Sequence, residues 1–87
     1  MNIMQTIDQA IIEFNKSQNK FKIINDENFE LIGQNSPLDS MAIINFLSLL
    51  ENKLFKNHNI KKNLMHEIFI VKKEKLSIKN LFLILDK

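Results

Sequence analysis

The segment LDSMAIINFLSLLENKL, residues 38–54, carries the strongest structural signal in the chain. Its apolar residues share one broad arc at about 100° per residue, which predicts an amphipathic helix from Ser40 to Leu54. The arc consists of Ile43, Ile44, Phe46, Leu47, Leu50 and Leu54. Either Asp39 or Ser40 can cap this helix, because a short polar side chain accepts hydrogen bonds from the first free amide groups. A separate stripe of Met41, Asn45, Ser48 and Asn52 lies on the other side.

On the N-terminal side of this segment, the spacing predicts another helix and a long connection. Ile3, Met4, Ile7, Ile11 and Phe14 recur at three- and four-residue steps, and this helix should end in the polar stretch 15–19. The connection runs from about Ser17 to Leu38, and loops of this length are usually functional or held by their own side chains. We expect six residues to anchor it in the core: Phe21, Ile23, Ile24, Phe29, Leu31 and Ile32. Residues 33–37, Gly-Gln-Asn-Ser-Pro, have turn chemistry.

On the C-terminal side, residues 56–63 are polar and predict a loop, followed by a short helical turn over 64–67. Residues 68–71 form a short apolar run that we expect to be extended or irregular. Ser77 is a suitable cap for a last helix over 78–85, with Ile78, Leu81, Phe82 and Leu85 on its buried face. The expected fold class is therefore all-α, a small bundle of three to four helices.

The composition limits the classes of protein to which the chain can belong. Its 87 residues are enough for one domain, residues 1–87, with no room for a second core. The chain has no Cys, which excludes disulfide scaffolds and thiol catalysis. Its single Gly excludes glycine-rich phosphate loops. There is no apolar run of the roughly 20 residues that a membrane span needs. Asp8 and Glu13 interrupt any N-terminal signal peptide, so we expect a cytoplasmic protein.

The charges are unevenly distributed along the chain, and every basic residue is Lys. Residues 1–40 hold six acids and three lysines, a balance of −3, whereas residues 41–87 hold four acids and nine lysines, a balance of +5. The sum is the net charge of +2. A Lys-rich half can contact phosphates, but without Arg and exposed interleaved aromatics a solvated basic face is the expected interpretation. We therefore expect no nucleic-acid partner. A small nucleic-acid binder that uses the Lys-rich half stays open as an alternative.

Other chemistry-bearing residues give weaker signals. His58 and His66 are eight residues apart with no Cys or Asp pattern beside them, so we expect no metal site and no catalytic residues. Six phenylalanines are expected in the core: Phe14, Phe29, Phe46, Phe55, Phe69 and Phe82. Ser40 is different, because a Ser at a helix N-terminus is exposed, and a phosphate attached there is favoured by the free amides.

The stretch 31–41, Leu-Ile-Gly-Gln-Asn-Ser-Pro-Leu-Asp-Ser-Met, running into the helix that ends at Leu54, resembles the acyl carrier protein family. In that family an Asp-Ser-Leu motif opens the second helix of a small bundle. Asp39 and Ser40 match its first two positions, Met41 replaces the Leu, and the Leu50-Glu51 step also matches. The resemblance implies a bundle with a long loop between its first two helices.

The resemblance also implies a function for Ser40. This residue would carry a 4′-phosphopantetheine arm, transferred from coenzyme A by a phosphopantetheinyl transferase, and the thiol of the arm would hold an acyl group as a thioester. The carrier itself would not be an enzyme, since the chemistry lies in the cofactor. Asp39 and Met41 would flank the attachment site, and Asn45, Ser48 and Asn52 would join Met41 in contacting partners. These partners would be an acyl-loading enzyme and an acyltransferase or synthase.

The stripe of Met41, Asn45, Ser48 and Asn52, which would contact partners, differs from the family's usual sequence, because many carriers place Glu or Asp there. An uncharged stripe gives weak electrostatic steering, which favours a stand-alone carrier dedicated to one lipid or polysaccharide pathway over a general fatty-acid carrier. D-alanyl carrier proteins are another class within the family whose sequences fit the Asp-Ser-Met motif of residues 39–41. From a different class, a helical protein-interaction module without a prosthetic group stays open, with Ser40 only capping its helix. A monomer is expected in each case.

Overall fold

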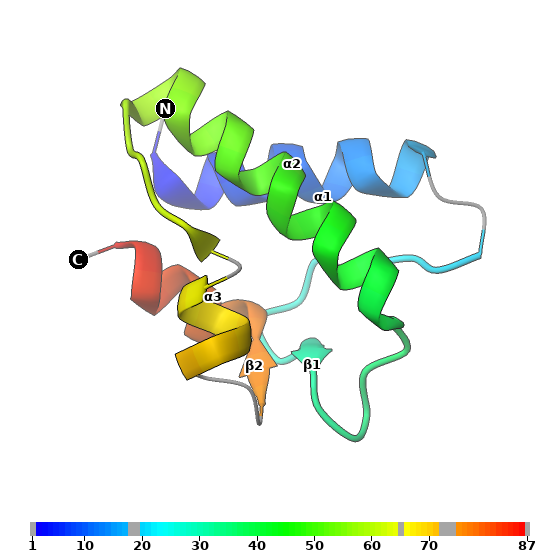
Figure 1. Ribbon diagram of the computed structural model, residues 1–87. Coiled ribbons are helices and arrows are strands. Elements are labelled where there is room, and N and C mark those ends of the chain that lie inside the picture. Colours follow the sequence, from blue (N-terminus) through cyan, green and yellow to red (C-terminus); the bar gives the residue numbers. More distant parts are fainter. Residues whose placement is uncertain (1, 18–19, 65, 72–74, 87) are drawn as a thin grey trace.

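The computed structural model describes residues 2–17, 20–64, 66–71 and 75–86 (Figure 1). Its elements follow the order α1 (Ile3–Ser17), β1 (Glu30–Ile32), α2 (Ser40–His58), η1 (His66–Val71), β2 (Leu76–Ser77) and α3 (Ile78–Leu85), where η1 is a π-helical segment. The protein is therefore mostly helical, as the sequence predicts. It also contains a two-stranded sheet, which the apolar pattern did not predict.

Helices α1 and α2 provide the centre of the core. Ile7 and Phe14 are buried on one face of α1, and they meet the buried arc of α2. The rings of Phe14 and Phe46 pack edge to face, with centroids 5.8 Å apart and ring planes at 87°. At the start of α1, the side chains of Asn2 and Gln5 accept hydrogen bonds from each other's backbone amides, which satisfies two free donors of this helix.

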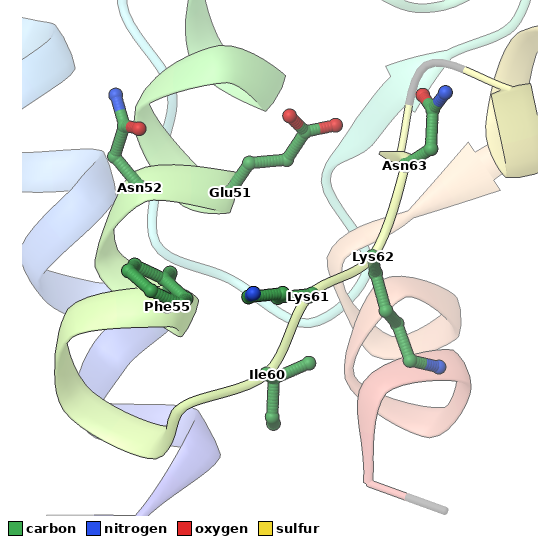
Figure 2. A pocket seen from close by; sticks show the side chains of 7 residues that line it. All are labelled: Glu51, Asn52, Phe55, Ile60, Lys61, Lys62 and Asn63. Carbon is green, nitrogen blue, oxygen red and sulfur yellow. The ribbon is translucent and has the colours of Figure 1, made fainter.

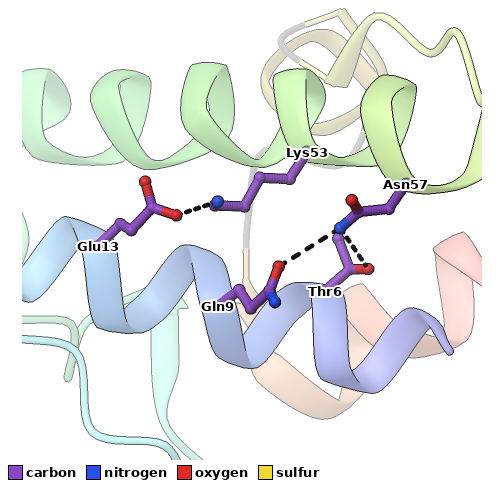
Figure 3. Close-up of polar contacts among 5 residues, drawn as sticks. All are labelled: Thr6, Gln9, Glu13, Lys53 and Asn57. Atoms are coloured by element: carbon purple, nitrogen blue, oxygen red, sulfur yellow. Dashed lines mark hydrogen bonds and ion pairs between the residues drawn. The ribbon is translucent and has the colours of Figure 1, made fainter. Parts of the chain in front are cut away.

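A row of polar contacts runs along one edge of the α1–α2 contact and shows that the two helices are antiparallel (Figure 3). Glu13, late in α1, forms an ion pair with Lys53. One helical turn earlier, the Gln9 side chain accepts a hydrogen bond from Asn57 Nδ2 at 3.4 Å. Thr6, the one polar side chain buried among the described residues, also accepts from Asn57 Nδ2, at 3.3 Å.

The long connection between α1 and α2 is held by a few side chains and by Asn15. The Asn15 amide donates to the carbonyl of Ile23 at 2.9 Å and accepts from its N–H at 2.8 Å. Ile23 and Leu31 are buried, as predicted. Ile24 is 65% exposed, so its predicted role as an anchor is wrong. Ile23, held by Asn15, takes the buried place in this segment, and Ile24 faces outward. Phe29 is among the half-buried residues that pack against the core.

The sheet fastens this connection to the C-terminal part of the chain. β1 pairs with β2 in the antiparallel sense, with Glu30 opposite Ser77 and Ile32 opposite Leu76. Immediately after β2, Ser77 caps α3 by accepting a hydrogen bond from Asn80 N at 3.2 Å, as predicted. The sheet therefore places the segment before α2 beside the start of α3 (Figure 1).

Two boundaries after residue 54 differ from the predictions. The loop predicted over 56–63 begins later, because α2 continues to His58 and ends where Asn59 adopts the left-handed conformation with φ of 55°. The Asn59 N–H donates to the carbonyl of Phe55 at 3.0 Å. Residues 68–71, expected to be extended or irregular, belong to η1. Asn63 explains this helical start, since its side chain accepts from His66 N at 3.0 Å.

Candidate functional site

Asp39 sets the start of α2. Its backbone is extended, with φ of −85° and ψ of 176°, and its Oδ1 accepts a hydrogen bond from Ala42 N at 2.8 Å. Its carbonyl accepts the first helical bond, from Ile43 N at 3.0 Å. Of the two candidate caps, Asp39 is therefore the one that the structure uses, and Ser40 is the first residue of the helix.

Ser40 is exposed at the beginning of α2. Within the described residues, its hydroxyl makes no hydrogen bond, and the role of helix cap is already filled by Asp39. This hydroxyl lies at the N-terminus of a helix, where the aligned peptide dipoles produce a partial positive charge. Ser40 thus presents an accessible oxygen, without a structural role of its own, where a phosphate ester is electrostatically favoured.

The turn before α2 is tightly organised. The Ser36 hydroxyl donates to the carbonyl of Leu31 at 2.7 Å and lies 3.2 Å from Leu38 N, which donates to it. Gly33 has φ of 145°, and a Cβ there would lie only 2.9 Å from Glu30 Oε1. The positive φ is what favours glycine here, because residues with a Cβ rarely adopt it, while the Glu30 carboxylate is the end of a flexible side chain. These contacts join β1 to the buried Leu38 and fix where Asp39 and Ser40 lie.

Substitutions at Asp39 and Ser40 should distinguish the residue that caps α2 from the residue whose hydroxyl makes no hydrogen bond. We expect Asp39→Ala to lower the free energy of unfolding by about 1 kcal/mol, because the amide of Ala42 loses its acceptor. Asp39→Asn should retain most of the stability, and Ser40→Ala should change it by less than about 0.5 kcal/mol. Urea unfolding followed by circular dichroism measures all three. An equal loss for Ser40→Ala and Asp39→Ala would contradict the assignment of the cap.

The predicted partner stripe is brought together on one face of α2. Met41, Asn45, Ser48 and Asn52 are all exposed, and Met41, next to Ser40, is exposed to 62%. None of the four side chains carries a charge. The stripe continues one turn further to Phe55, which is 48% exposed. The predicted burial of Phe55 is therefore wrong, because its spacing from Asn52 places it on the outer face.

Two side chains of the predicted apolar arc and one histidine take part in the packing of α2. Phe46 and Leu47 are each 1% exposed and belong to the core. The Nε2 atom of His58 lies 2.7 Å from the hydroxyl of Thr6, so this ring joins α2 to α1. In the described ranges, no three residues among His, Cys, Asp and Glu gather as a metal site. The side chain of Phe69 lies outside the described part.

No protein-family model, curated protein or solved structure matches this chain. Among the described residues, no helix combines the length and the apolar character needed to cross a bilayer.

Proposed function

We propose that the protein is an acyl carrier protein, whose Ser40 bears a 4′-phosphopantetheine arm. The observation that carries the proposal is the exposed Ser40 hydroxyl, which makes no hydrogen bond within the described residues while Asp39 caps the helix. The attached group would be a phosphodiester, and its negative charge suits the N-terminus of a helix of 19 residues. The chain's own residues therefore fit this prosthetic group.

The arrangement of the elements supports the same class of protein. The long connection between α1 and α2 and the Asp-Ser step that opens α2 are the features that the family resemblance implies. The β1–β2 pair is an addition to the all-α bundle that the resemblance implies. On this proposal a transferase attaches the arm, and the thiol at its end holds an acyl or aminoacyl group. The carrier presents that group to partner enzymes and catalyses nothing itself.

The surface next to Ser40 supports a carrier dedicated to one pathway. Met41, Asn45, Ser48 and Asn52 are exposed but uncharged, so long-range attraction of a basic partner by this stripe is weak. Recognition would rely on shape and on apolar contact with Met41. Loading with an acyl or D-alanyl group, and a cytoplasmic location beside the partner enzymes, belong to the same proposal.

Enzymatic loading followed by intact mass spectrometry tests the proposal. Incubation with coenzyme A and a broad-specificity phosphopantetheinyl transferase should add one arm to the wild-type chain and none to Ser40→Ala. Ser48→Ala is the matched control, because Ser48 is an exposed serine on the same helix, and this variant should still be loaded. A wild-type chain that stays unmodified, or a Ser40→Ala chain that gains the arm, would refute the assignment. Ser40→Asp in cells separates the carrier from an interaction module, which should tolerate it.

A further inference from the structure

An open groove of about 540 Å³ lies at the C-terminal end of α2 (Figure 2). Glu51, Asn52 and Phe55 of α2 form one wall, and residues 60–63, which leave the helix and run back beside it, form the other. Ser40 lies 15 residues before Phe55, about 22 Å away along the helix axis. The groove is thus separate from the attachment site of the proposed arm.

The groove has an apolar part that solvent reaches. Phe55 is 48% exposed, and the half-buried Ile60 continues the apolar surface toward the core. The Nζ atom of Lys61 lies 5.4 Å from the centroid of the Phe55 ring, and its side chain extends from the opposite wall toward that ring (Figure 2). An apolar side chain bound here would contact Phe55 beside a positive charge.

Positive charge lies on the wall formed by residues 60–63. Lys61 and Lys62 line the groove, and the exposed Lys56 follows Phe55 on α2. Within the described part of the chain, none of these three lysines has an acidic partner, since the two ion pairs use Lys53 and Lys75.

Glu51, the one acid among the described residues that line the groove, has a structural contact of its own. Its Oε2 accepts a hydrogen bond from Leu64 N at 2.6 Å, and this contact ties the two walls together. Two lysines without an acidic partner among the described residues, Lys61 and Lys62, therefore line the groove beside its apolar part.

We propose that this groove binds an acidic segment of a partner protein, with an apolar side chain of that segment on Phe55 and Ile60. Its carboxylates would pair with Lys61 and Lys62, and such charge complementarity favours an acidic peptide over a basic one. A nucleic acid would need an extended basic track, whereas the neighbouring Lys53 is neutralised by Glu13. The proposal goes beyond the carrier function and holds whether or not Ser40 is modified.

Fluorescence anisotropy on the unmodified chain tests this proposal, so that its outcome is independent of loading at Ser40. The probe is a short fluorescein-labelled peptide in which Glu alternates with Leu. Binding should saturate and weaken with added salt, because exposed charges are screened. The double variant K61E/K62E should weaken binding at least about tenfold, and Phe55→Ser should weaken it by a similar factor.

The matched control is the double variant K16E/K79E, which changes the net charge equally at exposed lysines of α1 and α3. Its affinity for the probe should stay within about twofold of the wild-type affinity, because net charge alone has only a weak effect on binding. The proposal would be overturned by no saturable binding at low salt, by equal losses for control and groove variants, or by equal binding of a peptide in which Lys replaces Glu. Tighter binding of a single-stranded oligonucleotide through Lys61 and Lys62 would also overturn it.

Discussion

Phe46→Ala is expected to lower the free energy of unfolding by about 3–5 kcal/mol, the range found when a buried Phe is replaced by Ala. Phe46 is 1% exposed, and its ring packs edge to face on Phe14. The substitution removes this aromatic pair and leaves a cavity between α1 and α2. Since small domains have only about 5–15 kcal/mol of stability in total, the variant should be near the limit of folding. Thermal and urea unfolding of the purified variant measure the effect.

Phe55→Ala is the matched control for this prediction, because it removes the same ring from the same helix at an exposed position. It should cost about 1–1.5 kcal/mol, since only about half of the Phe55 side chain is buried. Equal losses for the two variants would show that the packing of α2 differs from that described here.

Glu51→Ala should produce the second large loss of stability, about 1–3 kcal/mol. The Glu51 carboxylate accepts from Leu64 N at 2.6 Å, and Leu64 itself is fully buried. Without the carboxylate, this N–H is left without its acceptor at a point where the chain packs back onto α2. Glu51→Gln keeps an acceptor oxygen of nearly the same reach and should recover much of the loss. A Glu51→Ala variant as stable as the wild type in urea unfolding would contradict this role.

Helices α2 and α3 and their caps were the most predictable parts of the fold. Each has an apolar arc of helical spacing directly after a residue that suits an N-cap, Asp39 or Ser77, and both features are local in the sequence. The β1–β2 pair was not predictable in this way. Strands of three and two residues are too short to show a period, and their pairing depends on contacts across more than forty positions.

The parts of the candidate site that lie on one helix were predictable, and the parts formed by separate segments were not. The Asp39–Ser40 step and the exposed stripe after it follow from local sequence, because they lie on one helix. The groove does not, since its walls come from α2 and from residues 60–63, which were expected to be a simple loop. Phe55 was misassigned to the core for a related reason. Hydrophobicity alone marks it as buried, and only its position on the helix, three residues after Asn52, marks it as exposed.

Peptide mapping by tandem mass spectrometry, on the chain purified from the cells that naturally make it, tests the central claim most directly. The carrier proposal predicts phosphopantetheine on the peptide that contains Ser40, with the modified atom assigned to that residue. It predicts no such group on Ser36 or Ser48, which flank the site in sequence. Intact chains with an unmodified Ser40, or with the arm on another serine, would contradict the proposal that Ser40 carries the acyl group.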